Sequence, residues 1–327
     1  MKLQIQSPLI RTVRESEPHR IPKNIFLKIC LFFAVFLIMA TVESVFSMIG
    51  MAGDIIPIYK EAFASGGANS SDLMEKLAAV TSDPKYLPVS LICTGFGTIT
   101  VLLWCRFVEG RKLNTMGFTK EKVLPQYLLG LLAGFASFSA IVGLSALFGG
   151  VEFSGFKGQF TLTLLITFIG YGIQGMSEEV LCRGYMMTST FRHQNLWWAV
   201  GINSVIFALM HSANNGISLI AMLNLALYGV TASLYMLRTN NIWGISAYHS
   251  IWNFVQGNFY GLPVSGTDSG DTIFSFSFKG TELVNGGGFG LEASIAATIV
   301  LAVWIVCLLF VPNPFAKKTD TPAQPAA

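Results

Sequence analysis

Long apolar runs constrain the fold of this chain more than any other feature of its sequence. Several of them reach the roughly 20 residues that a helix needs to cross a bilayer. Only 12% of the 327 residues are charged, whereas a soluble domain has about 25%. Backbone groups inside a bilayer must be paired internally, and the runs lack the alternation of barrel strands. The sequence therefore predicts an all-α, polytopic membrane helical bundle.

We expect about eight transmembrane helices in a single domain, residues 25–311. A polar, basic tail (1–24) precedes this domain and a disordered tail (312–327) follows it, while residues 260–290 form a polar loop. Basic residues gather in alternate loops, so the positive-inside rule places both termini in the cytoplasm. The expected spans are about 25–51, 87–105, 127–148, a fourth starting near 159, 196–212, 217–237, 242–259 and 293–311.

Composition also limits the partners of this chain. The net charge of +3 is modest and gives no support to nucleic-acid binding. The five cysteines show no pair spacing, so we expect neither a disulfide framework nor a thiolate metal cluster. Two further elements are expected outside the spans. They are a short surface helix at 72–80 and, at 274–278, a short strand or a membrane-touching lip.

An acid pair near the end of the fourth apolar run is the first candidate for chemistry. Charges at membrane depth are costly and by default mark a working site. Glu179 and Arg183 are four residues apart on one helix face, so they can pair. Glu178 points about 100° away, on the stripe that also carries Gln174. The pattern indicates one structural carboxylate and one working carboxylate.

Two further polar pairs lie within apolar helices. Phe207 and His211 share a face of the fifth helix, and His249 and Asn253 share a face of the seventh. The fourth and fifth helices are joined by a short turn and should run antiparallel. Counting from that turn places Glu178 and His211 at one depth, roughly 24–26 Å away. The same count puts His249 only about 12 Å from its own turn, so the seventh helix must begin deeper or tilt.

These residue types suit peptide hydrolysis. A carboxylate in an apolar site, assisted by His211, can hold and deprotonate a water that attacks an amide carbonyl. His249 and Asn253 are donors suited to the developing oxyanion. No cofactor is required for this chemistry. Zinc bound by Glu178, His211 and His249 is an alternative, although the His-Glu-x-x-His signature is absent. A nucleophilic Ser or Cys is a weaker alternative, because none is obviously paired with a base.

At these residues the chain resembles the CAAX proteases and bacteriocin-processing enzymes, also called the CPBP or Abi family. The match consists of Glu178-Glu179-x-x-x-Arg183, Phe207-x-x-x-His211 and His249-x-x-x-Asn253, in order and on successive helices. It covers a core of about residues 105–257. The resemblance implies an intramembrane endopeptidase in which Glu178 and His211 activate water and His249 and Asn253 stabilise the oxyanion. Glu179, Arg183 and Phe207 would support them.

The resemblance also implies a class of substrate and a location. The substrate would be a membrane-embedded or lipid-modified peptide, of the CAAX type or a leader or bacteriocin precursor, and the family has been described both as metalloproteases and as glutamate-dependent enzymes. We expect a multi-pass protein of a bacterial cell membrane. One alternative is a non-catalytic bacteriocin-immunity or regulatory protein that binds a membrane peptide. A transporter is disfavoured, because the two-half repeat common in transporters is missing.

Overall fold

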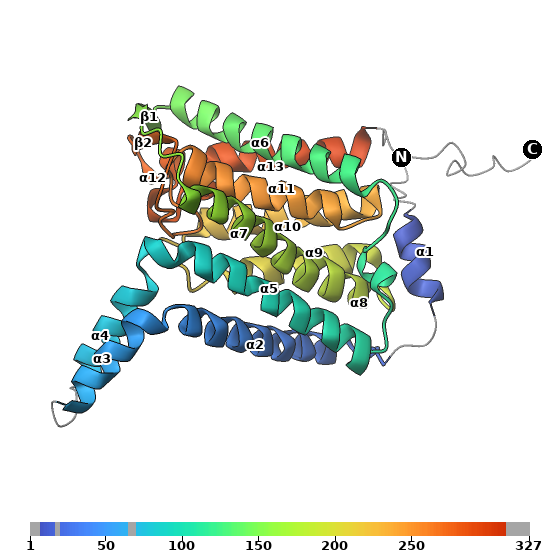
Figure 1. Ribbon diagram of the computed structural model, residues 1–327. Coiled ribbons are helices and arrows are strands. Elements are labelled where there is room, and N and C mark those ends of the chain that lie inside the picture. The colour runs from blue at the N-terminus through green and yellow to red at the C-terminus, as the bar shows by residue number, and fades with distance from the viewer. Residues whose placement is uncertain (1–6, 17–19, 65–69, 312–327) are drawn as a thin grey trace, which may run out of the picture.

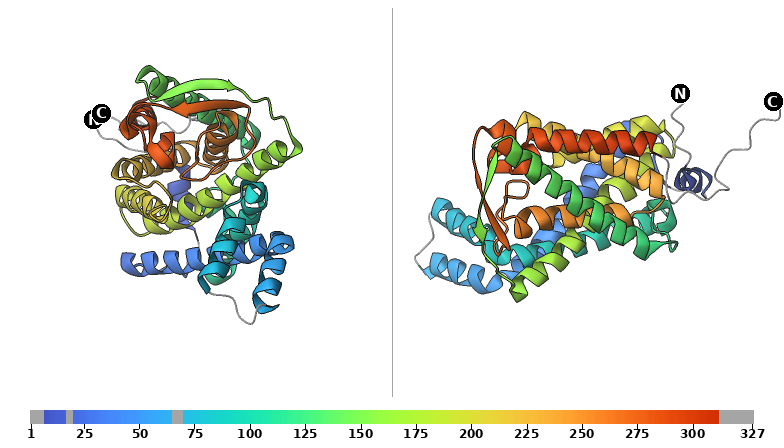
Figure 2. Two further views of the ribbon diagram at one scale, coloured as in Figure 1. Left: turned by 90° about the vertical axis from the view of Figure 1, so that its left-hand side faces the viewer. Right: turned by 90° about the horizontal axis from the view of Figure 1, so that it is seen from above.

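The computed structural model describes residues 7–16, 20–64 and 70–311. The predicted C-terminal tail, 312–327, lies outside the described residues. Eight long helices lie side by side along one common direction (Figures 1 and 2), which confirms the all-α bundle. They are α2 (Ile25–Gly50), α5 (Leu87–Leu103), α6 (Val123–Leu147), α7 (Leu162–Glu179), α9 (Leu196–Met210), α10 (Leu219–Thr239), α11 (Trp243–Phe254) and α13 (Ile295–Phe310).

Each of the eight predicted spans corresponds to one of these helices. Among the described residues, four helices are long and apolar enough to cross a membrane: α2, α6, α10 and the continuous segment Pro84–Val108 that contains α5. The helices α9 and α13 are apolar but shorter. Many large apolar side chains on the outside of the bundle are exposed, as expected where lipid rather than water surrounds a helix. The chain is an integral membrane protein.

Shorter elements lie at the two ends of the bundle or continue its long helices. The predicted surface helix is present as α4 (Ser70–Thr81), and it pairs with α3 (Ala52–Ala64) in a hairpin that projects from the bundle (Figure 1). Neither α3 nor α1 was predicted. The others are α1 (Pro8–Glu15), η1 (Pro84–Tyr86), η2 (Trp104–Val108), η3 (Leu113–Met116), η4 (Val180–Met187), α8 (Thr188–Phe191), η5 (Val255–Phe259), α12 (Glu282–Asn285), η6 (Gly287–Phe289) and η7 (Leu291–Ala293).

The strand predicted within 260–290 is present. Strand β2 (Phe274–Phe278) pairs antiparallel with β1 (Val151–Phe156), which follows α6. The two strands lie at the end of the bundle opposite α1 (Figure 1). Phenylalanines 153, 156, 274 and 276 contact one another across this ribbon. Together with the loop that precedes β2, the ribbon caps this end of the bundle.

Close contact between α7 and α11 depends on one glycine. A β-carbon on residue 175 would lie 2.5 Å from Oγ of Ser250 and 2.8 Å from its backbone nitrogen, so only glycine permits this approach. The start of α11 also lies beside η4. A β-carbon placed on Gly184 would lie 3.3 Å from Cδ1 of Ile242, the residue just before α11. Helix α11 therefore starts only about two turns past the acid pair, counted along the fourth span. It begins deeper than its turn alone suggested, and this brings His249 to the depth of Glu178.

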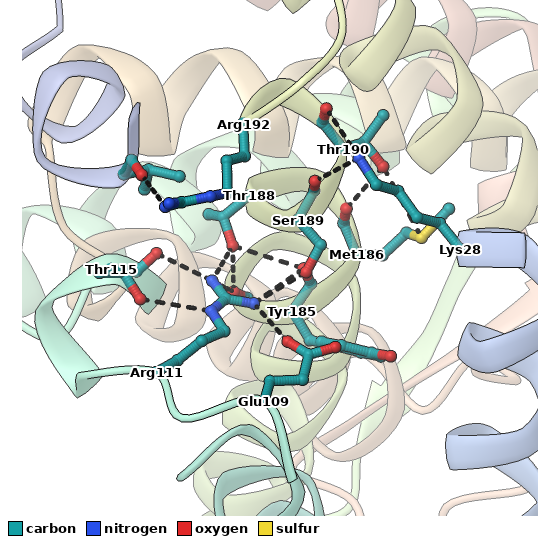
Figure 3. Close-up of polar contacts among 12 residues, drawn as sticks. Lys28, Glu109, Arg111, Thr115, Tyr185, Met186, Thr188, Ser189, Thr190 and Arg192 are labelled. Atoms are coloured by element: carbon teal, nitrogen blue, oxygen red, sulfur yellow. Dashed lines mark hydrogen bonds and ion pairs between the residues drawn. The ribbon is translucent and has the colours of Figure 1, made fainter. Parts of the chain in front are cut away.

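Buried cations stabilise the C-terminal part of the helix that carries the acid pair. The fourth span continues from α7 through η4 and α8 to Phe191, and buried side chains supply further hydrogen bonds to its backbone carbonyls. Arg111, which is 1% exposed, donates to the carbonyl oxygens of Gly184 (3.3 Å) and Tyr185 (3.5 Å). Lys28 of α2 donates to the carbonyl of Ser189 at 2.8 Å (Figure 3). Positive charge at this helix end also complements the helix dipole.

Candidate active site

A buried ion pair stands at the centre of the site. Glu179 is the last residue of α7, and its Oε1 accepts from Nη1 of Arg183, in η4, at 3.0 Å. Both side chains are fully buried. The guanidinium carbon of Arg183 lies 4.5 Å from the centre of the Phe207 ring and 5.7 Å from that of Tyr228, so two aromatic faces also stabilise the cation. All three supporting residues of the sequence motif are therefore in contact.

The same carboxylate oxygen orients His249. Nδ1 of His249, in α11, lies 2.9 Å from Oε1 of Glu179. A carboxylate can only accept, so this nitrogen carries the proton. The contact directs the other ring nitrogen, Nε2, toward Oε2 of Glu178 at 3.7 Å. Glu179 thus links the ion pair on α7 and η4 to the imidazole on α11.

His211 approaches Glu178 from a third helix. It follows the last residue of α9, and its Nδ1 lies 2.9 Å from the carbonyl oxygen of Phe207. Because a carbonyl only accepts, Nδ1 is again the protonated nitrogen and Nε2 is left facing the site. Nε2 lies 3.9 Å from Oε2 of Glu178. The structure therefore brings together Glu178 and His211, the two residues that depth counting placed in one layer.

Glu178 is the residue on which the site converges. Its Oε1 accepts a hydrogen bond from Nε2 of Gln174, one turn earlier on α7. Its Oε2 is buried, and among the described residues no group is within hydrogen-bond distance of it. Two imidazole nitrogens face it at 3.7 and 3.9 Å, too far for direct hydrogen bonds. This arrangement of acceptors leaves a position for a donor between them, and a water molecule can fill it.

Asn253 completes the set predicted from the sequence. It lies one turn after His249 on α11, is 5% exposed, and its Nδ2 donates to Oε1 of Gln174 at 3.0 Å. The four residues Glu178, His211, His249 and Asn253 all line one pocket. Within the described part of the chain, no three His, Cys, Asp or Glu side chains are arranged to hold a metal ion.

The walls of the pocket combine apolar and polar side chains. Glu292 is a second acid in the wall. Its Oε1 accepts from Nε1 of Trp252 at 3.1 Å, and its Oε2 accepts from the backbone nitrogen and hydroxyl of Ser265 at 2.9 Å each. These contacts fasten the turn at residues 264–267 to the pocket. The remaining lining residues are Leu87, Leu91, Tyr171, Gln174, Phe207, Asn214, Asn224, Leu225, Tyr228, Val264, Thr267 and Leu301.

Sequence reasoning did not assign roles to Gln174 or Glu292. Gln174 carried a usable signal, since it lies four residues before Glu178 and therefore on the same helix face. Glu292 carried none, because its contacts come from α11 and from the loop at 264–267, far away in sequence.

Comparison with known proteins agrees with the motif. Residues 159–255 match the family model described as type II CAAX prenyl endopeptidase, Rce1-like. This segment begins just before α7 and ends after α11, so it includes the acid pair, both histidines and Asn253. No curated protein matches the chain. That family is one of proteases that act on membrane-associated peptides, and residues 159–255 of this chain are similar to it.

Proposed function

We propose that this protein is an intramembrane endopeptidase that hydrolyses a peptide bond with a water activated by Glu178 and His211. One observation carries the proposal. Oε2 of Glu178 faces Nε2 of His211 at 3.9 Å and Nε2 of His249 at 3.7 Å, inside a pocket of a membrane-embedded bundle. Three helices supply these groups, so the arrangement exists only in the folded protein.

The first step is attack on the carbonyl carbon of the substrate. A water held between Glu178 and His211 gives a proton to the Glu178 carboxylate as its oxygen adds to the carbonyl carbon. Oε1 of Glu178 already accepts a hydrogen bond from Gln174, so Oε2 is the oxygen that receives the proton. The same proton then passes to the leaving amine, the C–N bond breaks, and Glu178 returns to its starting form.

The second requirement is a pair of donors for the developing oxyanion. One N–H of the Asn253 amide is used by Gln174, and the other is left for the substrate. His249 already donates from Nδ1, so donation from Nε2 requires the imidazolium form. Carboxylates on both sides, Glu178 and Glu179, stabilise that cation. Removal of one such donor typically costs about 3–4 kcal/mol of transition-state stabilisation.

For the substrate we propose a membrane-embedded or lipid-modified peptide, either a prenylated CAAX sequence or a leader peptide. The family description names prenyl endopeptidases, and the site lies within a bundle surrounded by exposed apolar side chains. A multi-pass arrangement in a bacterial cell membrane, with both termini cytoplasmic, belongs to the same proposal. We propose catalysis without a metal, in which the Glu178 carboxylate itself accepts the proton of the water.

The test is a cleavage assay on purified protein in lipid vesicles. The substrates are a peptide ending in a farnesylated CAAX sequence and the same peptide without the farnesyl group. We expect the wild type to cleave at least one of them, with or without a chelator, and Glu178→Gln to be inactive at an unchanged thermal midpoint. Cleavage that persists in Glu178→Gln would overturn the mechanism. Loss of cleavage with chelator, restored by zinc, would overturn the metal-free proposal.

A further inference from the structure

We propose that Gln174 is a positioning residue that orients both the Glu178 carboxylate and the Asn253 amide. The proposal rests on the function proposed above. Gln174 is half-buried on α7 and lines the pocket. Its Nε2 donates to Oε1 of Glu178, and its Oε1 accepts from Nδ2 of Asn253 at 3.0 Å. One amide therefore connects the residue that accepts the water proton to a residue that stabilises the oxyanion.

The Glu178 carboxylate needs such an anchor because its other contacts are long. Oε2 has no hydrogen-bond partner among the described residues. The two imidazole nitrogens that face it are 3.7 and 3.9 Å away and do not fix its rotation. The terminal torsion of a glutamate is broad, so a carboxylate without an anchor samples many orientations. The bond from Gln174 selects the one that turns Oε2 toward both histidines.

The Asn253 amide gains a defined plane from the same contact. Its NH₂ group has two N–H donors in fixed directions. Since Gln174 accepts one of them, the direction of the other is also set, and this second donor is the one left for the substrate. Fixing donors before the reaction is what makes oxyanion stabilisation effective, because nothing must reorganise in the transition state.

A neutral amide suits this position better than any charged residue. Lysine would form an ion pair with Glu178 and hold the carboxylate away from the water proton, and it has no acceptor to offer Asn253. A second carboxylate would accept from Asn253 but repel Glu178. Glutamine donates in one direction and accepts in the other. Because the amide does not ionise, it neither takes nor supplies the proton that passes between the water and Glu178.

The experiment compares Gln174→Met with Thr167→Val in the vesicle assay. Methionine keeps the length of the side chain and removes both hydrogen bonds. Thr167 lies two turns earlier on the same face of α7, and its hydroxyl bonds only to the carbonyl of Thr163 in its own helix, at 2.8 Å, so it is the matched control. We expect kcat of Gln174→Met to fall roughly 10- to 100-fold, the effect of losing one hydrogen bond to a charged group. KM should stay within about twofold, and Thr167→Val should match the wild type.

Two further measurements separate positioning from folding. Gln174→Glu keeps the acceptor for Asn253 but replaces the donor to Glu178, so it should also lose kcat at an unchanged thermal midpoint. In an Asn253→Ala background, Gln174→Met should cost clearly less than it does alone, because the two residues act together. Wild-type kcat in Gln174→Met and Gln174→Glu, with Glu178→Gln inactive, would overturn the positioning role and leave the function intact. Activity in Glu178→Gln would overturn the function itself.

Discussion

Replacing Gly175 by alanine tests whether close packing of α7 on α11 builds the site. The added β-carbon would lie 2.5 Å from Oγ of Ser250, which can rotate away, and 2.8 Å from the Ser250 nitrogen, which cannot. Restoring an ordinary contact of 3.4 Å at that nitrogen requires the two helices to separate by about 0.6 Å. Overpacking of this kind typically costs about 1–3 kcal/mol of stability.

The same displacement acts on the hydrogen bonds that join the two helices. Nδ1 of His249 lies 2.9 Å from Glu179, and Nδ2 of Asn253 lies 3.0 Å from Gln174. They would lengthen to about 3.5 and about 3.6 Å, at or beyond the limit of a hydrogen bond. A displacement approaching 1 Å at a catalytic group can cost roughly 100-fold in rate. We therefore expect Gly175→Ala to lose at least about tenfold in kcat and to unfold at a lower temperature.

Gly172→Ala is the matched control for Gly175→Ala. It lies on the same helix, but the atom nearest to an added β-carbon is the hydroxyl oxygen of Tyr127 at 3.9 Å, an ordinary contact. This variant should keep full activity and gain about 0.5–1 kcal/mol, because alanine suits a helix interior better than glycine. Both variants would be measured by peptide cleavage and thermal unfolding in the same vesicles. Equal activity and stability in the two would refute the packing argument.

Two other predictions concern residues outside the motif. Arg111→Met removes a buried cation from the carbonyl groups of Gly184 and Tyr185 in η4 and from its buried ion pair with Glu109 (3.5 Å), and it should cost about 3–5 kcal/mol in thermal unfolding. Arg106→Met, at an exposed arginine of the same segment, should change little. An unchanged midpoint for Arg111→Met would contradict its structural role. Glu292→Ala releases the turn held through Ser265 and should raise KM several-fold, whereas Glu282→Ala, at an exposed position of α12, should not. Equal KM values in these two variants would show that the turn does not shape the pocket.

The sequence predicted the bundle and the four central residues because both depend on local patterns. Runs of apolar residues fix the spans, and the four-residue spacing in each motif fixes a helix face. Glu178 and His211 could be placed at one depth because a short turn joins their helices. His249 could not, since its depth depends on Ile242 packing beside Gly184. That contact joins residues 58 positions apart, and no periodicity reveals it.

The missed elements have equally physical causes. Helix α3 contains Pro57, which breaks a helical pattern when the sequence is read alone, although the proline is accommodated in the structure. Helix α1 lies in a segment that is polar overall, and its few apolar residues pack only against the folded bundle. Leu9 and Val13 are buried there, at 3% and 1% exposure. Tertiary contacts therefore decide whether these segments are helical, and such contacts cannot be read from local sequence.

The shared oxygen of Glu179 has a consequence for how the protein tolerates charge inside the bilayer. Two carboxylates and one guanidinium leave the inner cluster with a single negative charge when both imidazoles are neutral. Uptake of one proton by His249 cancels that charge, and release of the proton restores it. In the proposed reaction the cluster would alternate between two ionic states that differ by one proton, and neither state would have to recruit a counterion from the surrounding lipid. Peptide hydrolysis can proceed in this hydrocarbon setting as long as water and protons reach the pocket.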